Sequence, residues 1–144
     1  MKKLFDVETV EETKALIENG ADINEKDWLG NTPLHYAESA EIAELLIEAG
    51  ADVNARNKYN TTPIHFANDL IEVAKVLIEH GADVNVKDKF NSTPLHFAET
   101  TEVAKELIKA GADVNARDRF NRTALHCAES AEVKELLIEN GGTL

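Results

Sequence analysis

Two short stretches, Thr32-Pro33-Leu34-His35 and Gly50-Ala51-Asp52-Val53-Asn54, recur along the chain and decide its fold. The first returns as Thr62-Pro63-Ile64-His65, Thr93-Pro94-Leu95-His96 and Thr123-Ala124-Leu125-His126. The second also begins, with isoleucine or valine as its fourth residue, at Gly20, Gly81 and Gly111, and Gly141 takes the place of its glycine near the end. Successive glycines are 30, 31, 30 and 30 residues apart. This fixed period predicts a stacked array of equivalent units.

Each unit contains the signals for two helices. Thr32 suits the N-cap of a helix and Pro33 suits its first position, so a short helix is expected from Thr32 to about Glu38. Ser39 can cap a second helix, and Gly50 fits a left-handed residue just after that helix ends. The apolar residues between them follow the helical spacing: Ile42, Leu45, Leu46 and Ile47. In the later units the second cap falls to Asp69, Thr100 and Ser130.

A hairpin is expected between the second helix of one unit and the first helix of the next. Residues 51–56 alternate like an extended arm, with Val53 and Ala55 on one face. Each tip then ends in glycine or asparagine, the residues that tolerate a positive φ. The four tips are Asp27-Trp28-Leu29-Gly30, Asn57-Lys58-Tyr59-Asn60, Asp88-Lys89-Phe90-Asn91 and Asp118-Arg119-Phe120-Asn121.

Composition and charge narrow the class of protein. The 144 residues are 43% hydrophobic and 29% charged, which predicts a folded, soluble chain, and no apolar run approaches the roughly 20 residues of a membrane span. The net charge of −12 argues against binding to nucleic acid or to an anionic membrane. Cys127 is the only cysteine, and Asp6 interrupts the start before a secretory signal could form. We therefore expect a cytoplasmic protein.

The repeated motif resembles the ankyrin repeat over almost the whole chain. The resemblance implies an all-α solenoid, in which pairs of helices are joined by β-hairpin loops. The usual ankyrin period is about 33 residues, whereas the period here is 30 or 31. The missing residues fall between the two helices of a unit, so a tighter turn is expected there. The third unit keeps one extra residue near Asp69-Leu70-Ile71, which predicts a local bulge.

The predicted domain is single, spans residues 1–144 and holds about five repeats including polar caps. An N-terminal capping repeat without its hairpin covers 1–24. Three repeats follow at 25–54, 55–85 and 86–115, and a C-terminal capping repeat covers 116–144. The column that holds Ala43, Ala74 and Ala104 contains Thr13 at the front and Lys134 at the back. Isolated stacks need polar ends, so both residues are expected on terminal faces.

The residues that could carry chemistry have simpler structural interpretations. His35, His65, His96 and His126 occupy equivalent positions, and packed helices about 8–10 Å apart hold such side chains too far apart to share a metal. The resemblance implies instead that each histidine braces the neighbouring hairpin. Cys127 takes the place of Tyr36, Phe66 and Phe97 and is expected to pack. We predict no catalysis, no cofactor and no metal site.

Charge and aromatic residues are distributed unevenly over the unit. The carboxylates form runs at helical spacing, which predicts solvated helix edges: Glu38, Glu41, Glu44, Glu48 and Glu129, Glu132, Glu135, Glu139. Basic and large apolar residues gather at the hairpin tips, where equivalent positions should form two parallel rows. These eight residues, called the tip row below, are the predicted partner-binding residues: Trp28, Leu29, Lys58, Tyr59, Lys89, Phe90, Arg119 and Phe120.

These patterns predict a monomeric, non-catalytic scaffold that binds a partner protein through the tip row and the concave helix face. Aromatic residues and arginine are typical of interface hot spots, although the tips could also pack against one another. Two other functions remain open. The basic tips could hold a phosphorylated small ligand or an RNA end. Alternatively, the acidic helical face could mimic nucleic acid in an inhibitor or immunity role.

Overall fold

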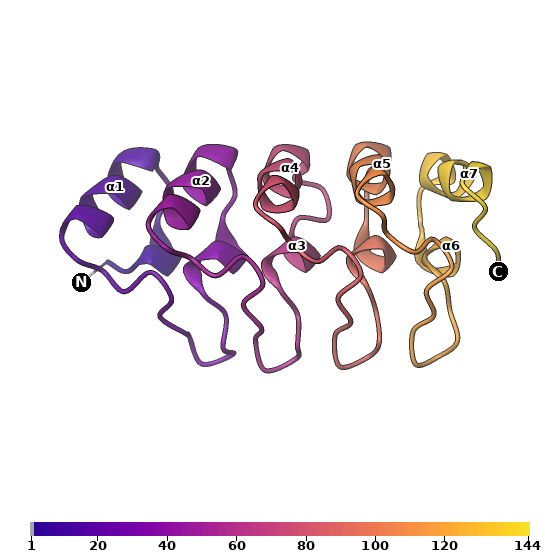
Figure 1. The fold of residues 1–144 in the computed structure, drawn as a ribbon, viewed down its shortest axis with the longest axis horizontal. Coiled ribbons are helices and arrows are strands. Elements are labelled where there is room, and N and C mark those ends of the chain that lie inside the picture. The colour runs from indigo at the N-terminus through magenta and orange to yellow at the C-terminus, as the bar shows by residue number, and fades with distance from the viewer. Residues whose placement is uncertain (1) are drawn as a thin grey trace.

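The computed structural model describes residues 2–144; Met1, the first residue of the predicted N-terminal capping repeat, lies outside them. Five units, each a short helix followed by a longer one, stand side by side along the long axis, with the two termini at opposite ends (Figure 1). The longer helices form one layer and the hairpin loops project together on the other side (Figure 1). No strand is assigned within residues 2–144. The all-helical repeat architecture expected from the sequence is confirmed.

The first helix of each unit is a single turn. These helices are η1 (Leu4–Asp6), η2 (Pro33–Tyr36), α3 (Pro63–Phe66), η3 (Pro94–Phe97) and α6 (Ala124–Cys127). The expected extension of the second unit's helix to Glu38 is wrong, because Ala37 is already extended, with φ −64° and ψ 117°. The short connection leaves no room for another turn before the next helix begins. Glu38 therefore lies in the turn between the two helices.

The second helix of each unit has nine residues. These helices are α1 (Val10–Glu18), α2 (Ala40–Glu48), α4 (Ile71–Glu79), α5 (Thr101–Lys109) and α7 (Ala131–Glu139). The predicted caps Ser39, Thr100 and Ser130 are confirmed, since each hydroxyl accepts a backbone N–H three residues on. Asp69 is not a cap. The extra residue moves the helix start by one position, so Leu70 precedes α4 without a side-chain cap.

The backbone has the expected positive φ after each longer helix and at the end of each tip. The glycine after each longer helix has a positive φ, 104° at Gly50. The tips end as expected, with φ 82° at Gly30 and 58° to 63° at the three equivalent asparagines. The arms are less extended than predicted: Val53 and Asn54 form a turn, closed by a hydrogen bond from the Ala55 N–H to the Asp52 carbonyl.

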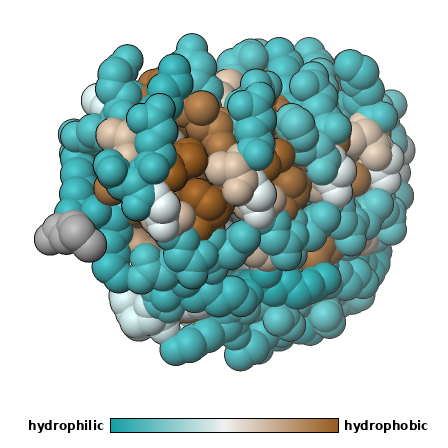
Figure 2. Space-filling model, turned by 60° about the vertical axis from the view of Figure 1, so that its left-hand side comes forward, coloured by the Kyte–Doolittle hydropathy of each residue, from teal (hydrophilic) through white to brown (hydrophobic). Residues whose placement is uncertain are grey.

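The core fills the space between successive units and includes a layer between their longer helices, each of which contacts the next along the chain. One leucine column is almost fully buried at Leu46, Leu77, Leu107 and Leu137. Its first member, Leu16, is only half-buried, because its helix belongs to the first of the five described units. The leucine column therefore faces the preceding unit. Figure 2 shows hydrophobic side chains gathered on the face that includes this N-terminal end.

The alanine column faces the following unit, and its two ends differ from each other. Ala43, Ala74 and Ala104 are fully buried, whereas Lys134 is exposed as predicted. Thr13 was expected on a terminal face, and this is wrong, since its side chain is buried between α1 and α2. The Thr13 hydroxyl donates to the Thr9 carbonyl at 2.9 Å. This bond inside the helix satisfies the buried polar group.

Candidate partner-binding surface

The hairpin tips are tied to one another by backbone hydrogen bonds. The N–H of Lys58 donates to the Leu29 carbonyl at 2.9 Å, that of Lys89 to the Tyr59 carbonyl at 2.8 Å, and that of Arg119 to the Phe90 carbonyl at 2.8 Å. Each bond joins one tip to the next, so the eight residues predicted from the sequence lie in continuous rows. The structure therefore brings all eight together along one edge of the stack.

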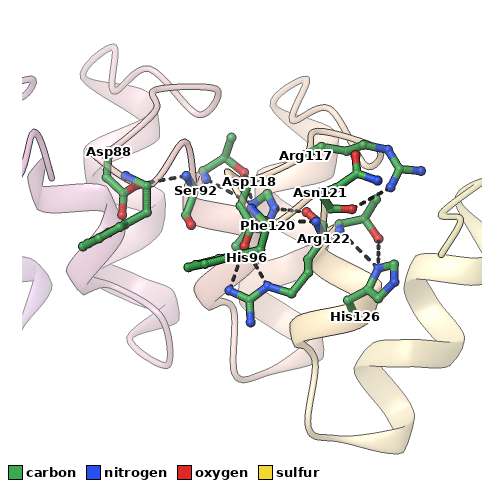
Figure 3. Close-up of polar contacts among 12 residues, drawn as sticks. Asp88, Ser92, His96, Arg117, Asp118, Phe120, Asn121, Arg122 and His126 are labelled. Atoms are coloured by element: carbon green, nitrogen blue, oxygen red, sulfur yellow. Dashed lines mark hydrogen bonds and ion pairs between the residues drawn. The ribbon is translucent and has the colours of Figure 1, made fainter.

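Within each tip, one side chain holds the turn. Asp27 accepts the backbone N–H groups of Leu29 and Asn31, both at 2.9 Å. Asn57, Asp88 and Asp118 repeat this pattern, and at the last tip Arg122 also donates to Asp118 (Figure 3). Sequence reasoning missed these four residues as determinants of the tip geometry. Their signal is an aspartate or asparagine three residues before the residue of positive φ.

The surroundings of Asp27 and Asp118 favour the charged form of each carboxyl group. Burial has the largest single effect on Asp27 and raises its pKa. The hydrogen bonds from Tyr36, Asn31 and Leu29 outweigh this effect and hold the pKa of Asp27 below its ordinary value. For Asp118, burial again raises the pKa, and the hydrogen bonds and charge of Arg122 lower it further than burial raises it. Both carboxylates are thus stable acceptors that fix the tips.

The tip side chains are exposed and also touch one another. The exposed fractions are 78% for Trp28, 47% for Tyr59, 38% for Phe90 and 59% for Phe120, whereas Leu29 is half-buried. The Arg119 guanidinium lies between two rings, 4.4 Å from the Phe90 centroid and 4.7 Å from that of Phe120. Lys89 lies 5.7 Å from the Tyr59 centroid. Mutual packing and exposure, which the sequence presents as alternatives, therefore coexist.

The three basic residues of the tip row have no acidic partner. Among residues 2–144, no carboxylate lies within 4.0 Å of the side-chain nitrogens of Lys58, Lys89 or Arg119. Lys58 instead donates to the Trp28 carbonyl at 2.5 Å. The chain as a whole carries a net charge of −12. The tips thus form a basic edge on an acidic protein.

A second row of aromatic side chains lies on the short helices beside the tips. Tyr36, Phe66 and Phe97, called the aromatic row below, are each close to 39% exposed. The rings of Tyr36 and Phe66 meet edge to face, with centroids 6.3 Å apart. The Tyr36 hydroxyl donates to Asp27 at 2.6 Å, which fastens this row to the first tip. The aromatic row therefore borders the tip row.

The repeated histidines brace adjacent units. Nδ1 of His35 accepts the Thr32 N–H at 3.0 Å, and its Nε2 donates to the Thr61 carbonyl of the next hairpin at 3.2 Å. His65 and His96 repeat both contacts; the link from His96 to Arg122 is visible in Figure 3. His126 keeps only the contact to its own Thr123 among the described residues and is exposed. This geometry agrees with the bracing role implied by the resemblance.

These contacts predict a pH dependence of stability. Burial is the main effect at His35 and His65 and lowers the pKa of each below the ordinary 6.5. The unfolded chain therefore binds more protons than the folded chain as the pH falls below about 6.5. The free energy of unfolding should be fully retained above that pH and should decrease below it, down to the lower pKa of the folded state.

Urea unfolding of the wild type between about pH 7.5 and pH 5 measures this decrease. In a His35→Asn/His65→Asn variant, stability at neutral pH should be lower, but the decrease between the two pH values should shrink. An equally large decrease in the variant would show that other groups cause it.

Cys127 ends the last short helix, at the position that the aromatic row occupies in earlier units. Burial is the main effect on the thiol and raises its pKa, the opposite of what a nucleophilic thiol needs. Within residues 2–144, no group of three or more His, Cys, Asp or Glu side chains is arranged to hold a metal ion. In the same part of the chain, no helix is long and apolar enough to cross a membrane.

Comparison with known proteins agrees with this geometry. The family model described as "Ankyrin repeats (3 copies)" matches residues 6–88 and again residues 68–143. The chain therefore belongs to the ankyrin-repeat family, whose members generally act by binding other proteins. No curated protein matches the chain.

Proposed function

We propose that this chain is a non-catalytic scaffold that binds a partner protein through the tip row and the adjoining concave face. The observation that carries the proposal is the ladder of backbone hydrogen bonds between tips whose side chains remain exposed. Because Lys58, Lys89 and Arg119 already have fixed neighbours, little conformational entropy is lost on association. Preorganisation of this kind supports binding more than it supports any reaction.

Side-chain chemistry also supports a protein partner. Tyr59, Phe90 and Phe120 offer large apolar areas that a partner could bury, and aromatic residues are enriched at hot spots. The unpaired Lys58, Lys89 and Arg119 favour an acidic surface opposite them, and such charges determine orientation and association rate more than affinity. Both features belong to the same rows, so one partner surface can use both.

Replacement of Tyr59, Phe90 and Phe120 by alanine is the direct test. A partner is first isolated by affinity capture from the source cells, identified by mass spectrometry and purified. The free energy of binding to this partner should be weaker in the triple variant by at least about 2 kcal/mol, because hot-spot residues carry most of the interface energy. Circular dichroism should show unchanged helicity, since all three side chains lie outside the core.

A matched control is Glu41→Gln/Glu102→Gln/Glu132→Gln, three equivalent exposed positions in the first turns of α2, α5 and α7. This control should bind like the wild type. The reverse pattern, with weak binding by the control and normal binding by the tip variant, would contradict the proposal and favour a role for the acidic helical face.

A further inference from the structure

Carboxylates lie in the turns that follow four of the short helices, at the end of each helix away from the preceding tip. Glu38, Asp69, Glu99 and Glu129, called the turn row below, lie in the turns between the two helices of successive units. The sequence pattern assigns Glu38 and Glu129 to solvated helix edges, but α2 begins at Ala40 and α7 at Ala131. Both residues therefore stand apart from the helical acidic runs.

One residue of the aromatic row and two residues of the turn row line the same hollow. A hollow of about 440 Å³ is bordered by Phe97, Cys127, Glu99 and Glu129, together with Asn68 and Ser130. The Asn68 side chain donates to Glu99 at 2.5 Å, and the Glu99 N–H donates to the Asn68 carbonyl at 2.9 Å. These contacts fix Glu99 at the rim of the hollow rather than along a helix.

Charge on the concave face is therefore divided across its width. Among residues 2–144, none of the four turn-row carboxylates has a basic partner within 4.0 Å. Lys58, Lys89 and Arg119 form the opposite border, likewise without an acidic partner. The aromatic row lies between, because Tyr36 contacts the first tip and Phe97 borders the hollow beside Glu99. The order across the face is basic, aromatic, acidic.

We infer that this face accepts an amphipathic protein segment with an apolar stripe, carboxylates along the edge toward the tips and lysines or arginines along the edge toward the turn row. The inference rests on the proposed function and specifies the chemistry of its partner. Charge complementarity selects this occupant, because a segment with one sign of charge on both edges would meet a like charge at one border. The same division of charge determines the direction in which the segment lies.

Two synthetic helical peptides provide the test. Each has about 18 residues and is about 27 Å long, which spans three units. Both have the same composition and the same leucine stripe. The segregated peptide has glutamate on one edge and lysine on the other, and the mixed peptide has both on each edge. The segregated peptide should bind about tenfold more tightly, and the difference should shrink in about 0.5 M salt.

The direction in which the peptide binds provides a second readout, because nonspecific binding has no preferred direction. A spin label on the peptide N-terminus broadens amide signals near either the third or the fifth unit. In a variant with Lys58→Glu, Lys89→Glu, Arg119→Glu, Asp69→Lys, Glu99→Lys and Glu129→Lys, the segregated peptide should still be preferred but should bind in the opposite direction. If this variant does not fold, Lys89→Glu alone should reduce the preference for the segregated peptide.

Equal affinity for the two peptides, an unchanged direction in the charge-swapped variant, or no binding of either peptide would overturn this inference. None of these results decides the proposed function, because that depends on the captured partner and the tip variants.

Discussion

Replacing Leu77 with alanine is expected to lower the free energy of unfolding by about 3 kcal/mol. Leu77 lies in the last turn of α4 and is fully buried against the preceding unit. The substitution removes apolar contacts and leaves a cavity that two helices cannot close without moving. Urea unfolding followed by circular dichroism measures the loss.

Leu16→Ala is the matched control for this prediction. Leu16 occupies the same column at the end of the stack, where it is only half-buried. Its replacement should cost clearly less than that of Leu77, because less area leaves water there on folding. Equal losses at the two positions would contradict the view that each leucine is buried mainly by the unit before it.

Replacing Ala74 with lysine should destabilise the protein by about 4 kcal/mol or more, because it would bury a charge without a partner. Ala74 is fully buried in the column that faces the following unit. In the last unit the same column holds Lys134, which is exposed. The same residue type is therefore tolerated at the end of the array and expected to be disruptive inside it.

Thermal unfolding of Ala74→Lys and of the control Lys134→Ala tests this contrast. The control should stay within about 0.5 kcal/mol of the wild type, as surface substitutions usually do. A stable Ala74→Lys variant, with an unfolding temperature close to the wild type, would mean that the units do not pack as tightly as the buried alanine column indicates.

Most of the architecture follows from local signals in the sequence. The period, the caps at Ser39, Thr100 and Ser130, and the positive φ of Gly50 and Gly30 all depend on chemistry within a few residues. Such signals are legible because a cap or a left-handed residue has few alternatives. The family model confirms the repeat type that these signals indicate.

The errors arise where neighbouring units override local preference. Thr13 has a polar side chain, but α2 covers it, and its hydroxyl finds a carbonyl within its own helix. Asp69 is a good cap by residue type, yet one inserted residue shifts the start of α4 past it. Glu38 continues a helical spacing, but Ala37 ends the short helix first. Each outcome depends on packing that a single segment does not reveal.

The binding surface was likewise predicted only in part from the sequence. The sequence places the tip row on one edge because equivalent positions recur at a fixed period. It does not reveal that Arg119 lies between Phe90 and Phe120, or that Asp27 fastens Tyr36 to the tip. The acidic turn row was also missed, because spacing assigns Glu38 and Glu129 to helix edges and residue type assigns Asp69 to a helix cap. These contacts depend on the distance and orientation between units.

Cross-saturation from an unlabelled partner to the labelled protein, recorded by NMR, tests the proposed binding surface most directly. For the partner isolated by affinity capture, saturation should reach the amides at Lys58, Tyr59, Lys89, Phe90 and Arg119, and those of the short helices beside them. It should leave the outer faces of α2, α4 and α5 unaffected. Saturation confined to those outer helical faces, with none at the amides of the tip row, would contradict the proposed binding surface.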